Sequence, residues 1–327
     1  MVVLCAPDKF RGTLTAAEAA RALADGARGA GRRARELPLA DGGEGTLDAL
    51  GGATRTAVVT GPLGDAIEAG WRLADGVAVI EAARASGLAL VERNDPIRAS
   101  TRGTGELIAA ALAAGAERVV VAVGGSATTD GGVGAVEVLG EPFRIPVIVA
   151  CDVRAQFLDA AREFGPQKGA SPDDVRLLSE RLEALAARYR DELGVDVSGL
   201  EGGGAAGGLA GGLAALGATL APGFELVAAE VGLDGALDEA DLVLTGEGRF
   251  DSTSFAGKVV GGVLARCEAR GIPALVVAGQ IPDGTAAAVP AISLVERFGR
   301  KRAYLETAAC VREAAAEATD RPAATQP

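Results

Sequence analysis

Chemically active side chains follow several apolar runs of this chain, at points where buried strands would end. These strand ends carry Asp8-Lys9, Asp41 with Glu44, Gly124-Gly125-Ser126, Asp152, and Glu247 with Asp251. In an open parallel sheet, ligands bind just beyond the carboxyl ends of the strands. Acids that meet there repel each other unless cations lie among them. The candidate cations are Lys9, Arg11, Arg102, Lys168, Arg249 and Lys258.

This set of side chains favours phosphoryl transfer, in which catalysis is mostly positioning and charge neutralisation. The chain contains no histidine, so acid–base chemistry must fall to Asp, Glu or Lys. For the same reason a metal ion would be a hard cation with oxygen ligands, such as Mg²⁺.

The glycine-rich stretches were tested against known phosphate-binding patterns. Gly124–Thr128 follows an apolar run and precedes a predicted helix, so its N–H groups could hold a phosphate or carboxylate, or it could be a tight turn. Gly257-Lys258 resembles the end of a P-loop, but Val259 follows where Ser or Thr is needed, and Ser252 stands where the first glycine is needed. This stretch is therefore not a P-loop. Gly202–Gly207 matches a dinucleotide pattern only by its glycines, and we expect it to pack tightly or approach a ligand.

Composition excludes several classes of partner. The chain has 327 residues and a net charge of −12, which argues against nucleic acid or an anionic membrane as partner, since phosphate binding needs a basic surface. No apolar run has the roughly 18 residues of a membrane span. The four cysteines show no paired spacing, so they are expected to be free thiols in a cytoplasmic protein. We expect a monomer or homodimer.

The elements that would position these side chains alternate between strands and helices. Strands are expected at 2–6, 36–40, 118–123, 146–152, 240–245 and 274–278, with helices after Thr15, from Thr104 to Ala114 and from Ser171 to about Leu193. This alternation predicts a parallel sheet covered by helices. Between 56 and 82 the pattern changes to short strands, with Asp75-Gly76 as a hairpin turn, which marks the start of a second domain.

Seven motifs, in order, resemble the bacterial type 1 glycerate kinase family over nearly the whole chain. They are Ala6–Gly12, Ala40–Thr46, Gly103–Ile108, Gly124–Gly132, Phe164–Ala170, Gly204–Gly208 and Thr245–Asp251. The resemblance implies an enzyme that phosphorylates D-glycerate with ATP and Mg²⁺, with 2-phosphoglycerate favoured over 3-phosphoglycerate as product.

The resemblance also implies an α/β fold of two domains: a Rossmann-like parallel-sheet domain plus an inserted mixed α/β domain, with the active site in the cleft between them. By that pattern residues 1–60 and 226–318 form the Rossmann-like domain, 61–225 form the insert, and 319–327 are a flexible tail.

Each candidate residue then has an expected role. The carboxylate of glycerate would be bound by Arg102, Lys168, Arg249 and the Gly124-Gly125-Ser126 loop. Asp251 or Asp41 would be the general base, and Lys9 or Lys258 would neutralise charge on the transferred group. Mg²⁺ would be held by Glu247, Asp8 or Asp152.

Some positions depart from the family pattern. Arg11 and Ala256 stand where the family usually has Lys and His, only Glu141–Ile145 remain of a longer segment, and Arg154–Phe157 replaces a different sequence. The last two changes leave open two other readings: a kinase for another small hydroxy acid, or a catalytically weak ligand-binding or regulatory protein on the same scaffold.

Overall fold

The computed structural model describes residues 1–255, 258–282 and 289–320. Within these residues the chain forms two compact units. Unit 1 contains residues 1–41, 48–50 and the chain from Phe224 onward, and unit 2 contains residues 42–47 and 51–223. The division differs from the predicted domains at β3 (Arg55–Thr60), which pairs along its length with β4 (Ala66–Ala74) of unit 2. The predicted cleft between domains stays a prediction.

The described strands of unit 1 form a parallel sheet in the order β11-β10-β9-β1-β2. Their bounds are β1 (Val2–Cys5), β2 (Arg33–Glu36), β9 (Leu242–Arg249), β10 (Ala274–Gln280) and β11 (Ala291–Ser293). The chain leaves β1 toward β2 on one side, and the later strands are added on the other side. The strand order therefore reverses between β1 and β9, the place where open α/β sheets bind ligands.

Two of these strands differ from the sequence prediction. The second strand is the polar segment Arg33–Glu36 rather than 36–40. A polar segment can form this strand because it lies at the sheet edge, where only every second side chain is partly buried. β9 continues through Glu247 to Arg249, because β10 extends beside it and pairs Gln280 with Arg249. Glu247 thus belongs to the strand itself, which fixes its backbone more firmly than a loop would.

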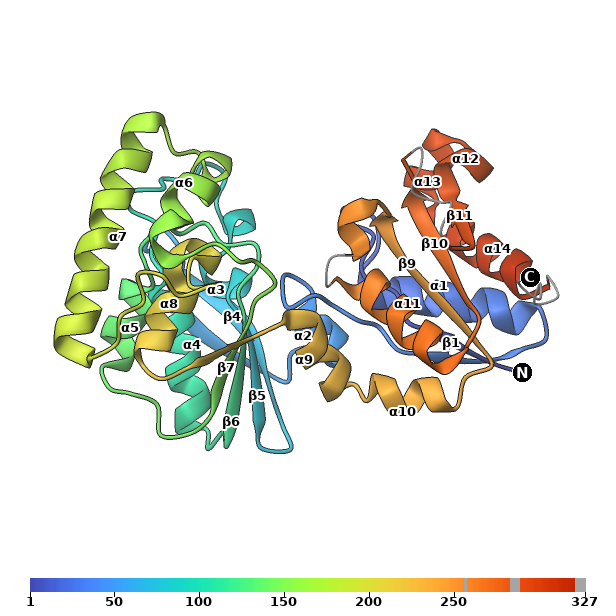
Figure 1. Cartoon of the computed structure of the whole chain (residues 1–327), viewed down its shortest axis with the longest axis horizontal. Coiled ribbons are helices and arrows are strands. Elements are labelled where there is room, and N and C mark those ends of the chain that lie inside the picture. Colours follow the sequence, from blue (N-terminus) through green and yellow to red (C-terminus); the bar gives the residue numbers. More distant parts are fainter. Residues whose placement is uncertain (256–257, 283–288, 321–327) are drawn as a thin grey trace. The chain divides into compact units, whose positions relative to one another are not determined.

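Helices cover both faces of this sheet, as Figure 1 shows. Side chains of β1 alternate between the faces: Val3 and Cys5 pack with α1 (Ala16–Gly29) and α14 (Thr307–Asp320), and Leu4 packs on the other face. The remaining helices of unit 1 are α9 (Gly223–Glu230), α10 (Leu233–Asp238), α11 (Val259–Arg270), α12 (Leu294–Phe298) and α13 (Arg300–Leu305). The predicted tail began at 319, but α14 ends at Asp320, and 321–327 lie outside the described residues.

Unit 2 has a mixed sheet, whose described strands follow the order β3-β4-β5-β6-β7-β8. The first three are antiparallel neighbours, and β5 (Val77–Glu81), β6 (Arg118–Ala122), β7 (Val147–Ala150) and β8 (Thr219–Ala221) are parallel. The predicted hairpin at Asp75-Gly76 joins β4 and β5, and both residues have positive φ, as the favoured two-residue turn requires.

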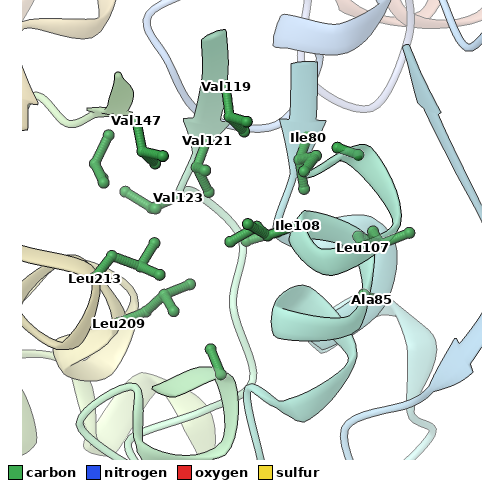
Figure 2. Packing of buried hydrophobic residues seen from close by; sticks show 14 of the residues in the cluster. Ile80, Ala85, Leu107, Ile108, Val119, Val121, Val123, Val147, Leu209 and Leu213 are labelled. Carbon is green, nitrogen blue, oxygen red and sulfur yellow. The ribbon is translucent and has the colours of Figure 1, made fainter. Parts of the chain in front are cut away.

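The main core of unit 2 lies between the parallel strands and helices α4 (Arg102–Ala113) and α8 (Leu209–Ala215). Figure 2 shows Ile80, Val121 and Val147 of the sheet near Ile108 and Leu213 of these helices. A second core forms beneath α7 (Pro172–Leu193), whose N-terminus has the predicted Ser171 cap. The other helices of unit 2 are α3 (Ala83–Ser86), α5 (Val133–Leu139) and α6 (Ala160–Phe164), and the short α2 (Thr46–Ala49) is divided between the two units.

The glycine-rich segment at 202–217 packs tightly, as expected. Gly207 has φ +69°, and a Cβ there would lie 2.0 Å from the carbonyl oxygen of Thr128. No side chain fits in that space, so glycine allows this segment to lie directly against the loop that follows β6. The predicted α/β class is confirmed, and none of the described helices is both long and apolar enough to cross a membrane.

Candidate active site

Unit 1 gathers acids and a lysine at the carboxyl end of β1. The Nζ atom of Lys9 lies 3.7 Å from Oδ1 of Asp8 and 3.7 Å from Oδ1 of Asp41. The backbone of Asp8 is fixed by its N–H, which donates to the carbonyl of Gly246 in β9 at 2.8 Å. The structure thus brings three predicted residues, Asp8, Lys9 and Asp41, together at the point where the strand order reverses.

Two carboxyl groups at this strand end, those of Asp8 and Glu247, have raised pKa values. Burial raises the pKa of Asp8 to about 6, with Lys9 opposing the rise and Asp41 adding to it. Burial also raises the pKa of Glu247 to about 7; the Ser254 hydroxyl opposes this rise and the charge of Asp8 adds to it. A nearby cation stabilises the ionised form of such carboxylates, because it offsets both the cost of burying their charge and their mutual repulsion.

Asp8 and Glu247 have the oxygen donors that a magnesium ion prefers. Oε1 of Glu247 is buried and has no hydrogen-bond partner among the described residues, so it can serve as a metal ligand. No group of three or more His, Cys, Asp or Glu side chains in the described part of the chain could hold a metal by itself. Magnesium needs no such cage, because it usually binds one or two carboxylates together with phosphates and water.

Three further predicted residues, Arg249, Asp251 and Lys258, lie between the end of β9 and the start of α11. Asp251 accepts hydrogen bonds from Nε of Arg249 at 2.9 Å and from the N–H and hydroxyl of Thr253. The hydrogen bonds from Thr253 and Arg249 lower the pKa of Asp251 to about 2. Asp251 therefore stabilises its own turn. Lys258 directly precedes α11 as its N-cap residue and carries a charge that lowers the pKa of Asp8 and Glu247.

In unit 2, Lys168 is almost completely buried. It ends a short 3₁₀ helix, Pro166–Lys168, and is 5% exposed. Its Nζ donates to the Ser126 hydroxyl at 2.9 Å and to the Thr128 carbonyl at 2.6 Å. An ammonium group has three N–H donors, and these described contacts use two. Burial lowers the pKa of Lys168 to about 8, and the charge of Asp130 opposes this.

Asp130 was not among the predicted site residues, although it lies in the glycine-rich motif. Its buried carboxylate accepts from the N–H and hydroxyl of Thr101 and from the N–H groups of Gly132 and Gly134. Asp130 thus accepts hydrogen bonds from backbone N–H groups at the start of α5, whose first residue is Val133. The N–H groups of Gly132 and Gly134 are thus used by the chain's own carboxylate, and neither belongs to the predicted loop Gly124–Thr128. Substrate binding by Gly124, Gly125 and Ser126 stays a prediction.

Comparison with known proteins decides the family. A sequence model described as "Glycerate kinase family" matches residues 3–145 and 141–323. The chain belongs to the glycerate kinase family. The predicted family is thereby confirmed.

Relatives of this glycerate kinase family member are similar over most of their length. The chain is 39% identical to a glycerate kinase of Halalkalibacterium halodurans and 39% identical to a glycerate 2-kinase of Escherichia coli, with 86% of both chains covered in each case. A solved structure from Salmonella typhimurium LT2, provisionally described as glycerate kinase 2, matches with a TM-score of 0.84 at 35% identity. That match covers 98% of this chain and 97% of the other.

The two parts of the family match overlap at residues 141–145, the segment that the resemblance led us to expect to be shorter than in the family. This segment connects the end of α5 to the amino end of β7, where the N–H of Phe143 donates to the carbonyl of Leu216. Ligands of parallel sheets bind at the opposite, carboxyl edge. Residues 141–145 therefore lie at the edge of the sheet opposite the one at which a ligand would bind. In the altered segment after β7, Phe157 is a core residue and Arg154 pairs with Glu201 at the surface.

The two remaining predicted residues of unit 2 lie in polar surroundings. Arg102, at the start of α4, is paired through Nε with Glu106 at 3.0 Å and is largely exposed. Asp152 follows β7, is exposed, and accepts a hydrogen bond from the N–H of Gly223 at 2.7 Å. The roles predicted for Arg102, Arg249 and Asp152 stay predictions. Ala256 and Gly257, part of the comparison with family motifs, lie outside the described residues.

Proposed function

We propose that this protein transfers the γ-phosphoryl group of ATP to D-glycerate in the presence of Mg²⁺, forming 2-phosphoglycerate. The observation that carries the proposal is the cluster of partly buried acids and a lysine at the β1–β9 switch point, formed by Asp8, Lys9, Asp41 and Glu247. The family and the names of the relatives support the choice of glycerate as acceptor.

In this proposal unit 1 supplies the groups that act on the phosphates. Asp8 and Glu247 would hold magnesium, which when bound offsets the negative charge of the nucleotide phosphates. Lys9 and Lys258 carry positive charge beside the same acids and would stabilise the charge on the phosphoryl group as it moves. The backbone N–H of Asp8 donates to the carbonyl of Gly246, which ties Asp8 to the strand that carries Glu247.

Asp41 is the better candidate for the general base. It would accept the proton of the glycerate hydroxyl while the hydroxyl oxygen bonds to the γ-phosphorus. The bond from that phosphorus to the bridging oxygen then breaks, and ADP leaves. Asp251 was the other candidate, but its oxygens already accept hydrogen bonds from Thr253 and Arg249, and a carboxylate with a lowered pKa is a weaker base.

Unit 2 would supply the group that recognises the substrate carboxylate. The buried ammonium of Lys168 has used two of its three donors, and a carboxylate is the acceptor that would best compensate its charge. The Ser126 hydroxyl accepts from Lys168 and keeps its own hydrogen for a second contact. Together the two groups would bind one end of a small hydroxy acid.

The test is an ADP-release assay with purified protein, ATP, D-glycerate and Mg²⁺. Turnover should require all three, and L-glycerate and lactate serve as acceptor controls. Phosphorus NMR of the product distinguishes the 2-phosphate from the 3-phosphate. An ADP signal no greater than that of a glycerate-free blank would contradict the proposal. Faster turnover of another hydroxy acid would instead reassign the substrate.

A further inference from the structure

One side chain ties together the two segments that surround the Lys168 amine. The two amide hydrogens of Asn94 Nδ2 are donated to the carbonyl of Ala127 at 2.9 Å and to the carbonyl of Lys168 itself at 2.9 Å. Asn94 lies in the loop between the 3₁₀ helix Leu88–Leu90 and α4. It is the only asparagine of the chain, and nothing in its local sequence indicated this role.

The orientation of this amide follows from its partners. Both partners are carbonyl oxygens, which can only accept, so the nitrogen must point toward them. The Asn94 oxygen then faces away and is buried without a hydrogen-bond partner among the described residues. An unsatisfied buried acceptor is unfavourable. The bridge therefore stabilises the fold less than two ordinary hydrogen bonds would, which points to a role in placement.

The geometry shows what the bridge places. Lys168 is held at its backbone carbonyl by Asn94 and at its amine by Ser126 and Thr128. Ala127 lies between Ser126 and Thr128 in the sequence, and its carbonyl accepts from the Asn94 amide. Its N–H donates to the carbonyl of Ser86 at 2.8 Å. One amide thus sets the spacing between the backbone that carries the lysine and the loop that receives its amine.

We propose that Asn94 is a positioning residue, which holds the Lys168 ammonium in place to bind the carboxylate of the substrate. The inference rests on the proposed function, in which Lys168 binds glycerate. Asn94 itself has no contact with the reacting atoms. Its loss should therefore weaken glycerate binding through Lys168 and leave the nucleotide side of the reaction unchanged.

The variant Asn94→Leu removes both donors and keeps the number and branching of the side-chain heavy atoms. We expect the KM for D-glycerate to rise by about tenfold or more, with the KM for ATP within about twofold and kcat less affected than KM. Asn94→Gln keeps the donors on a longer side chain and should recover part of the affinity; it also serves if Asn94→Leu fails to fold. The matched control is Tyr189→Phe, which removes a buried hydrogen bond to the carbonyl of Gly131 in the same unit. This control should lower Tm without changing the KM for glycerate.

A double-mutant cycle with Lys168→Met separates positioning from a general structural effect. If Asn94 acts through Lys168, adding Asn94→Leu to Lys168→Met should raise the KM no further. Equal increases in both backgrounds, or an unchanged KM in Asn94→Leu and Asn94→Gln, would overturn the inference. The proposed function fails separately, if the wild-type protein does not turn over D-glycerate or if Lys168→Met leaves its KM unchanged.

Discussion

Replacing Lys168 by methionine should separate substrate binding from stability. Burial lowers the pKa of Lys168 from 10.5 to about 8, which at roughly 1.4 kcal/mol per pKa unit means that burial disfavours the charged amine by about 3 kcal/mol. Against this, the hydrogen bonds that the amine donates to Ser126 and Thr128 contribute about 1.5–3 kcal/mol each. Methionine removes both effects, so the free energy of unfolding should change by no more than about 3 kcal/mol.

For substrate affinity, no gain offsets the loss of the contact between Lys168 and the substrate. Loss of one charge-assisted hydrogen bond to the glycerate carboxylate, about 1.5–3 kcal/mol, should raise the KM for D-glycerate roughly 10- to 150-fold. Steady-state assays at pH 7 measure the KM, and urea unfolding measures the stability. Lys301→Met is the control, since Lys301 is an exposed lysine on α13. An unchanged KM in Lys168→Met, with normal folding, would refute the reasoning.

Four further predictions concern pH and the acids of unit 1. Because the Lys168 ammonium loses its proton near pH 8, the KM for D-glycerate should rise above that pH in wild-type protein but not in Lys168→Met; Asp130 is the charged group that opposes this loss. The unfolded chain keeps that proton up to about pH 10.5, so this lysine makes the free energy of unfolding rise with pH between about 8 and 10.5, which urea titrations can follow. Glu247→Gln should lower kcat about 100-fold or more and weaken Mg²⁺ activation, which a magnesium titration measures; an unchanged Mg²⁺ dependence would exclude it as a ligand. Asp41→Asn should lower kcat by about 100-fold or more, whereas Asp251→Asn should mainly lower Tm; the reverse result would make Asp251 the base.

Sequence reasoning located features whose cause is local. The capping boxes at Thr15 and Ser171 and the turn at Asp75-Gly76 each depend on residues within three positions of one another. Lys168 was selected as a cation in a motif, but its burial depends on Ser126 and Thr128, about 40 residues away. The same is true of β2, a polar segment that becomes a strand only because β1 lies beside it.

Asn94 and Asp130 were missed for this reason. Each acts by joining segments that are distant in the sequence, and a single amide or carboxylate in a turn-like stretch looks like any other turn former. For Asn94 the one available signal was its rarity in this chain. For Asp130 it was the surrounding run of glycines, which indicated close packing but not which side chain would fill the space.

The sheet of unit 1 also affects how the protein is made. β1 lies between β2 and β9, so the second neighbour of Val2–Cys5 is not synthesised until the chain reaches Leu242. At roughly 5–20 residues per second, β1 waits some 10–50 s on the ribosome for that partner. During this time unit 2, whose strands all come before residue 224, is complete in sequence. We therefore expect nascent chains stopped after Gly223 to contain a folded unit 2 and an exposed apolar β1 that chaperones can bind.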